Sequence, residues 1–325
     1  MNRSSPRPGF AFFRAVLVRC EGSKPAAEGY SKPTCRVLTL TDVVARLEKR
    51  IMTRTPTTFS FPSMRRLFRY LGETDAMVEI TELATRSFTA SAKESGDVAT
   101  FVERQSQQHG VSVNLTELDL LSRHLGRNYI VTVYQSAERF LHEFRQEHIA
   151  LYRVEWIGDA QDVDPLTVAL RNVAATEGEA EKQIGADLIS RFQYYRTVRN
   201  WAVHTKDPDV SKPQAKFAEI VPYSVEHQET FRSVNAPNPP VDVCFDDFIF
   251  FSRLTKLIAE KLCRIATPPL DHWVQNFPLV RFKRLSKNPT RMRNAVSGRL
   301  RTQYGMNEAT ARWIADELCG SLAQR

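Results

Sequence analysis

Residues 184–205 read IGADLISRFQYYRTVRNWAVHT, and this stretch decides the fold. On an α-helix one of its faces is apolar, and the members of that face are Ile184, Leu188, Phe192, Tyr195, Val198 and Ala202. Arg199 falls near the middle of this face, where a core-packing helix would carry another leucine. A guanidinium stays charged, so a buried one needs an acidic or acceptor partner. The stretch therefore predicts a core helix with an inward-pointing arginine.

Composition and charge favour an all-α protein with basic ends. Strand-like alternation of Val, Ile and Thr is scarce along the 325 residues, whereas helical periodicity recurs. The net charge of +8 is unevenly placed: residues 1–36 hold seven Lys and Arg against two acids, and eight basic residues without an acid lie between Asp271 and Glu308. Basic ends suit a polyanionic partner, although they are also typical of solvated charge runs.

The cysteines and the apolar runs place the chain in the cytoplasm. Its five cysteines are scattered and lack C-x-x-C spacing, which indicates reduced thiols. His142 and His148 lack the spacing of a zinc motif, so we expect them on a helix surface and predict no metal and no cofactor. No apolar run reaches the length of a membrane span, so no membrane partner is expected.

The pattern along the chain predicts four parts. They are a disordered basic N-terminus (1–40), a helical N-terminal region (41–111), a helical domain (112–268) and a basic helical C-terminal extension (269–325). The first part is alternatively an over-extended start upstream of Met52 or Met64. Glycines are expected to end or interrupt helices at Gly72 and Gly126, and prolines predict an irregular connection over 207–243.

A resemblance to a known family enters at residues 199–204, RNWAVH. This run resembles the RNxxxH motif of the HEPN superfamily, which comprises helical domains that are often metal-independent ribonucleases of defence and toxin–antitoxin systems. The upstream stretch 133–144, VYQSAERFLHEF, is similar to the preceding helix of that family, with Tyr134 and Glu138 at the matching positions. The likeness covers residues 118–265, and six residues carry its most specific part.

The resemblance implies an HEPN-like helical bundle and an endoribonuclease that works as a homodimer on RNA. It also implies a role in phage defence or growth arrest, with an antitoxin or another defence protein as partner. His204 would act as general acid or base, and Arg199 would bind the charged phosphate of the transition state. Asn200 would orient His204 or hold the phosphate, and Glu138 would hold Arg199 or assist proton transfer. Lys206 departs from the pattern of members that carry a modified tyrosine there.

Further phosphate contacts are predicted for Arg196, Arg291 and Arg293, and the basic segment 279–301 either binds nucleic acid or forms a solvated tail. A structural interpretation competes with catalysis. An arginine on an apolar stripe is often paired with a core carboxylate, and a histidine at a helix end interacts favourably with the helix dipole. The alternative function is a non-catalytic helical module that binds nucleic acid or protein.

Overall fold

A computed structural model of the chain divides into two units, residues 1–56 and 57–325. The structure describes residues 59–114, 117–158, 164–203, 209–220, 231 and 235–323. Every regular element in this described part is helical, which confirms the predicted all-α class. The predicted disordered N-terminus (1–40) and the first residues of the predicted helical region lie outside the described residues.

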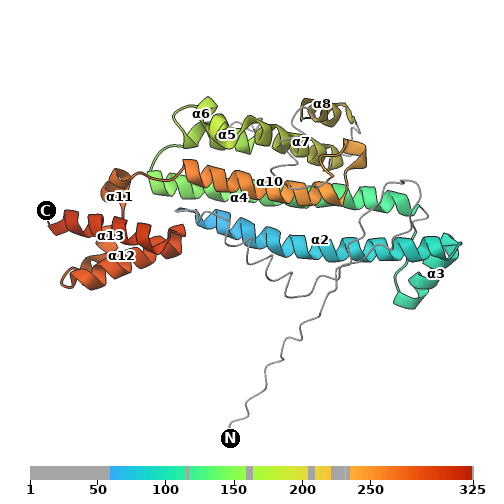
Figure 1. Cartoon of the computed structure of the whole chain (residues 1–325), viewed down its shortest axis with the longest axis horizontal. Helices are drawn as coiled ribbons and strands as arrows, with labels where there is room; N and C mark the ends of the chain where they lie inside the picture. Colours follow the sequence, from blue (N-terminus) through green and yellow to red (C-terminus); the bar gives the residue numbers. More distant parts are fainter. Residues whose placement is uncertain are drawn as a thin grey trace, which may run out of the picture. The chain divides into compact units, whose positions relative to one another are not determined.

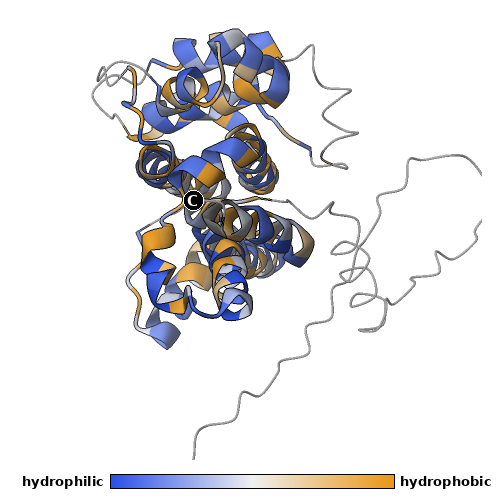
Figure 2. Cartoon of the chain, turned by 90° about the vertical axis from the view of Figure 1, so that its left-hand side faces the viewer, coloured by the Kyte–Doolittle hydropathy of each residue, from blue (hydrophilic) through white to orange (hydrophobic). Residues whose placement is uncertain are grey.

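The larger unit consists of three layers of helices, and two long neighbouring helices form the middle layer (Figure 1). The middle layer consists of α4 (Leu118–Tyr152) and α10 (Phe245–Ile265). One side is covered by α2 (Pro62–Glu94), and the other by α5 (Pro165–Val173), α6 (Glu177–Ile184) and α7 (Ala186–Val203). Figure 2 views the layers end on and shows hydrophobic and hydrophilic turns in the same helices, as expected of amphipathic elements.

Shorter helices complete the described part. α3 (Val98–His109) follows α2, α8 (Ser211–Ile220) packs against α7, and the 3₁₀ turn η2 (Pro240–Asp242) leads into α10. After α10 come α11 (Leu270–Asn276), the 3₁₀ helix η3 (Leu279–Leu285), α12 (Pro289–Tyr304) and α13 (Glu308–Ala323). The last two helices, α12 and α13, lie in the part predicted as a helical C-terminal extension, and they pack against each other.

The hydrophobic core is continuous from α2 to α13. Phe61, just before α2, meets Phe144 of α4 edge to face with ring centroids 5.2 Å apart. Trp273 of α11 and Phe59 contact Tyr304 of α12, at 5.0 Å and 5.6 Å. The core therefore crosses the boundaries predicted at residues 112 and 268, and the division into separate regions stays a prediction.

Three glycines behave differently from what their local sequence suggests. Gly72 and Gly126 lie inside the continuous helices α2 and α4, so the predicted breaks are wrong. At Gly126 a Cβ atom would collide with the backbone carbonyl of Val243, so this glycine allows a close approach of two segments. Gly185, with a φ of 104°, divides the predicted helix 184–205 and ends α6 before α7 begins.

Two further predictions about burial and connection are wrong. The helical spacing of Met77, Ile80 and Leu83 within the predicted helical N-terminal region suggests a core-facing stripe, but each is about 70% exposed, because the face of α2 that packs is the one carrying Leu71 and Val78. The connection after Pro208 is not wholly irregular, since α8 lies within it. Among the described helices, none is both long and apolar enough to cross a bilayer.

His148 is buried in α4, which corrects its predicted place on the helix surface. Its ring stacks on that of Tyr152 at 4.5 Å and meets Trp156 edge to face at 5.4 Å. Burial, and to a smaller extent the charge of nearby His272, lowers the pKa of His148 from its ordinary value of 6.5 to about 4. His148 is therefore a neutral core residue at pH 7. His142 is exposed, as expected.

Candidate active site

The conformation of α7 is fixed by the apolar stripe that its sequence predicts. Phe192, Tyr195 and Val198 are at most 2% exposed, and Tyr195 stacks on Phe251 of α10 at 4.6 Å. The Tyr195 hydroxyl donates a hydrogen bond to Asp247 Oδ1 at 2.8 Å. Because α7 is held on α10 by this buried contact, the next turn of α7, which carries Arg199, has a defined position.

Asp247 is a fully buried carboxyl whose oxygens are occupied by hydrogen bonds. It accepts from the backbone N–H groups of Asn238 at 2.9 Å and Cys244 at 3.0 Å, in addition to Tyr195. The contact with Cys244 forms part of the N-terminal cap of α10. Burial raises the pKa of Asp247 while these donors oppose the shift. The network is structural and anchors the loop before α10 to α7.

Arg199 points toward α4, where it meets Glu138. Its Nη2 lies 3.4 Å from Glu138 Oε2, which confirms the contact predicted from the sequence. Its Nη1 donates to Asn200 Oδ1 at 3.1 Å. The side chains of Arg199 and Glu138 are 21% and 38% exposed, so the ion pair lies at the edge of the core and is accessible to solvent.

Tyr134 forms the floor under this ion pair. The Arg199 guanidinium carbon lies 5.3 Å from the centre of the Tyr134 ring, a distance typical of a cation–π contact. Tyr134 is 2% exposed and packs on Phe192, and burial raises its pKa. The phenol is therefore neutral at physiological pH and serves as a platform for the guanidinium.

Arg196, predicted to contact phosphate, lies beside a second carboxylate. Its Nε is 3.5 Å from Asp164 Oδ1, and Asp164 Oδ2 accepts a hydrogen bond from Gln193 Nε2 at 2.6 Å. Asp164 also caps the start of α5 by accepting from the Thr167 N–H at 3.0 Å. The positive charge of Arg196 is thus partly balanced by a residue that is tied to the neighbouring helix.

The cluster around Tyr134 is close to electroneutral but still has unused donors. Two guanidinium groups, of Arg196 and Arg199, face two carboxylates, of Glu138 and Asp164. A guanidinium has five N–H donors, and hydrogen bonds to described residues occupy two of those of Arg199, while its buried Nε has no partner among them. Arg199 can therefore bind another oxyanion without leaving Glu138.

The other predicted site residues are not all brought to this cluster. Asn200 adjoins it and is half-buried, whereas His204 lies outside the described residues. Arg291 and Arg293 belong to α12, which packs on α13 and η3, and Arg293 Nε pairs with Asp316. In Figure 1, α12 and α13 lie near one end of α10, and the last turn of α7 lies near the other end. Any contact of α12 with RNA would thus be separate from Arg199.

Several residues of this region are absent from the sequence-based prediction. Asp164 precedes Pro165, and an aspartate followed by proline is a known signature of a helix start, so this residue had a local signal. The side chain of Arg191 is 1% exposed, and its Nη1 lies 2.8 Å from Asp187 Oδ2. The i, i+4 spacing of these two residues in the sequence already indicates such an ion pair. Tyr194 and Tyr195 are fully buried and hence cannot stack on a base.

No family model matches the chain, and neither the curated proteins nor the solved structures contain a significant match. The HEPN resemblance therefore rests on the residues of 133–144 and 199–204 alone.

Proposed function

We propose that the chain is a metal-independent endoribonuclease of HEPN type. Arg199, His204 and Asn200 form its reactive centre, and Glu138 is the positioning partner of Arg199. By the resemblance, the enzyme works as a homodimer in phage defence or growth arrest, together with an antitoxin or another defence protein.

The reaction is an internal transesterification of RNA. His204 takes the proton of the 2′-hydroxyl or gives a proton to the leaving 5′-oxygen, because imidazole titrates near neutral pH. The 2′-oxygen forms a bond to phosphorus while the bond from phosphorus to the 5′-oxygen breaks. The products are a 2′,3′-cyclic phosphate and a 5′-hydroxyl. Charge that builds up on the non-bridging oxygens would be met by the guanidinium of Arg199.

The observation that carries the proposal is the placement of Arg199. A buried structural arginine would have all its donors satisfied, as expected of polar groups in a core. Arg199 instead sits over Tyr134 at the edge of the core, with one carboxylate partner at 3.4 Å and unused donors. This arrangement holds a guanidinium in one orientation and leaves it able to bind phosphate.

Cleavage of total RNA by the full-length protein in the presence of EDTA tests the proposal. We expect the unmodified protein to leave 5′-hydroxyl ends, and both Arg199→Ala and His204→Ala to abolish cleavage. Absence of cleavage by the unmodified protein, or cleavage by both variants at the rate of the unmodified protein, would contradict the nuclease. Retained RNA binding without cleavage would instead support the non-catalytic module.

The homodimer has its own test. On a helix that continued to His204, five residues after Arg199, the two side chains would be about 140° apart, and one protomer would not easily direct both at one phosphate. If each site combines Arg199 of one protomer with His204 of the other, mixing the two inactive variants restores part of the cleavage. A mixture as inactive as its components would show that the groups act within one protomer.

A further inference from the structure

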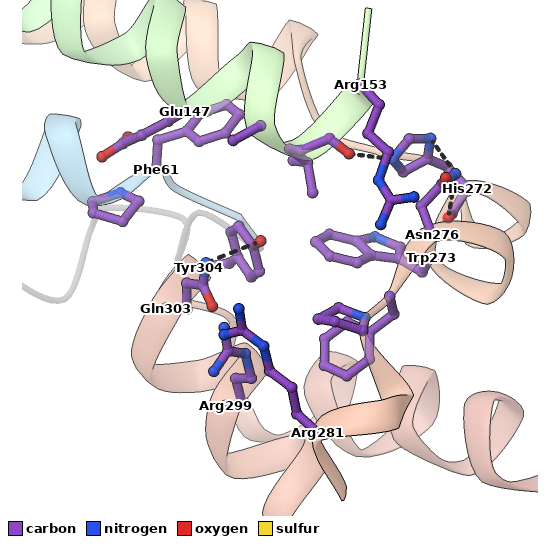
Figure 3. Close-up of a pocket in the computed structure, with 15 residues that line it drawn as sticks. Phe61, Glu147, Arg153, His272, Trp273, Asn276, Arg281, Arg299, Gln303 and Tyr304 are labelled. Atoms are coloured by element: carbon purple, nitrogen blue, oxygen red, sulfur yellow. Dashed lines mark hydrogen bonds between the residues drawn. The ribbon is translucent and has the colours of Figure 1, made fainter.

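A cavity of about 290 Å³ opens at the other end of α4 (Figure 3). Its walls come from four segments that are distant in sequence: the start of α2, the end of α4, the segment from α11 to η3, and the end of α12. Its volume lies just below the range of about 300–1,000 Å³ typical of small-molecule pockets. The cavity thus suits a ligand of mononucleotide size, and none of the residues proposed for RNA cleavage lines it.

Three arginines line this cavity, and each comes from a different element. Arg153 follows α4, Arg281 belongs to η3, and Arg299 belongs to α12. None of their guanidinium groups has a hydrogen-bond or ion-pair partner among the described residues, and the buried Nε of Arg299 is unsatisfied. In Figure 3 those of Arg281 and Arg299 lie on one side of the cavity and that of Arg153 lies on another. Like charges gathered without a counter-charge favour binding of an anion.

The carboxylate that also lines the cavity does not neutralise these arginines. Glu147 accepts hydrogen bonds from the Ser63 N–H, at 3.0 Å and 3.1 Å, and pairs with Arg66 at 2.8 Å. A neighbouring hollow between α2 and α4 provides a partial contrast, because two of its three arginines, Arg66 and Arg139, pair with Glu143, whereas Arg69 has no ion-pair partner among the described residues. In the cavity, all three arginines are without such a partner.

The remaining lining combines rings with amide and imidazole groups. Trp273 and Tyr304 pack against each other in the wall, with centroids 5.0 Å apart, and Phe277 extends it. His272 is held by the Leu151 carbonyl at 3.0 Å, and Asn276 lies 3.3 Å from the other ring nitrogen of His272. Aromatic walls beside guanidinium groups match a molecule that joins a flat ring to a phosphate.

Arg153 occupies its position at a conformational cost. Its φ of 55° makes it the only described residue other than glycine with a positive φ, at the place where helices commonly end in glycine. The left-handed conformation is unfavourable for an ordinary residue, because its Cβ atom comes too close to the following carbonyl oxygen. Strain of this kind clusters at ligand sites, where the side chain has a function that offsets it.

From these observations we propose that the cavity between α4, α11 and α12 binds a nucleoside monophosphate, with its phosphate against Arg281 and Arg299, its base against the partly exposed ring of Tyr304, and Arg153 contacting the ligand from another side of the cavity. This site goes beyond the proposed ribonuclease activity and does not depend on it.

Isothermal titration calorimetry of the full chain with the four ribonucleoside monophosphates tests the proposal, with adenosine, inorganic phosphate and a 5′-phosphorylated hexanucleotide as comparisons. We expect at least one monophosphate to bind, and to bind about tenfold or more tightly than adenosine or inorganic phosphate. Arg281→Gln and Arg299→Gln should each weaken this binding by about tenfold or more, since each removes a hydrogen bond to a charged group. Arg284→Gln is the matched control, because this exposed residue of η3 does not line the cavity.

Several outcomes would overturn the proposal. One is the absence of binding by all four monophosphates to a protein whose thermal unfolding shows that it is folded. Another is equal weakening by Arg284→Gln, which would mean a diffuse basic surface. Binding of the hexanucleotide alone would assign the cavity to a longer RNA surface, and binding of phosphate as tight as that of the nucleotide would remove the role of the aromatic wall.

Discussion

Two groups of arginines lie along α4, and they differ in how their charge is balanced. Near Glu138, Arg196 and Arg199 face two carboxylates across the interface between α7 and its neighbours. Fifteen residues further along α4, about 22 Å on a helix, Arg153 joins Arg281 and Arg299 around a cavity without a free carboxylate. A paired guanidinium is held in one orientation, whereas an unpaired guanidinium remains available to bind an anion. The first group suits chemistry on a transient charge, and the second suits binding of a stable one.

Replacing Arg199 gives the largest expected effect and tests whether the two groups work independently. Arg199→Ala should lower the rate of RNA cleavage by about 10²–10³-fold, the usual loss when a donor to a developing oxyanion is removed. Nucleotide binding at the cavity should not change. Initial cleavage rates and calorimetry on the same protein preparation measure the two effects.

The control for this substitution is Arg196→Gln, because the guanidinium of Arg196 is partly balanced by Asp164. It should reduce cleavage less than Arg199→Ala does. Both variants should unfold close to the temperature of the unmodified protein, since partly exposed ion pairs contribute about 0–1 kcal/mol to stability. A large fall in unfolding temperature for Arg199→Ala would show that its role is structural.

Acid should destabilise the cavity end of α4 through His148. Its folded-state pKa of about 4 lies below the ordinary 6.5, so the unfolded chain binds the proton more tightly. Stability is then lost as the pH falls from 6.5 toward 4, by about 3 kcal/mol for this one group. Urea denaturation at a series of pH values measures the slope.

His148→Phe should flatten this pH dependence, because a phenyl ring keeps the stacking on Tyr152 and takes up no proton. His142→Gln, at an exposed position of the same helix, should leave the slope unchanged. If the two variants have the same slope, the acid sensitivity arises from another group.

The contact between Arg199 and Glu138 was predictable in two steps, because helical periodicity indicates that Arg199 needs a partner and the HEPN resemblance indicates Glu138 as that partner. Helical periodicity places Arg199 on an apolar face, and a charge there requires a partner. The helical character of the C-terminal extension was predictable because helical periodicity is also a local signal. Gly126 was misread because its neighbour is the Val243 carbonyl, more than a hundred residues away. Gly72 was misread because the helical cost of glycine, about 1 kcal/mol, is small beside the packing of Leu67 and Leu71.

The cavity, by contrast, had no signal that a local pattern could carry. Arg281 and Arg299 appear in the sequence as members of a basic run, and such runs are usually solvated, while Arg153 appears as a single positive charge between apolar residues. Only the packing of α11 and α12 against the end of α4 brings them together. The unusual conformation of Arg153 is likewise a property of the folded chain and cannot be read from the residues around it.

Glu138→Gln should have an intermediate effect and shows whether this carboxylate positions Arg199 or transfers a proton. An exposed ion pair is worth about 1 kcal/mol or less, so loss of positioning should lower cleavage by about fivefold without changing the pH dependence of the rate. A loss as large as that of Arg199→Ala, together with an altered pH profile, would make Glu138 a catalytic base.

The smallest effect is expected at Arg153, and it has opposite signs for stability and binding. Arg153→Gly removes the guanidinium and relieves the strain of a φ of 55°, so the free energy of unfolding should rise by about 1 kcal/mol while nucleotide binding weakens. Arg153→Ala removes the same charge but keeps a Cβ atom in the strained conformation, so it should weaken binding without the gain in stability. Urea denaturation and calorimetry of the two variants separate the backbone from the side chain. Equal binding by Arg153→Gly and the unmodified protein would mean that the strained position holds no ligand contact, and the contrast between the paired and the unpaired arginines would then rest on Arg281 and Arg299 alone.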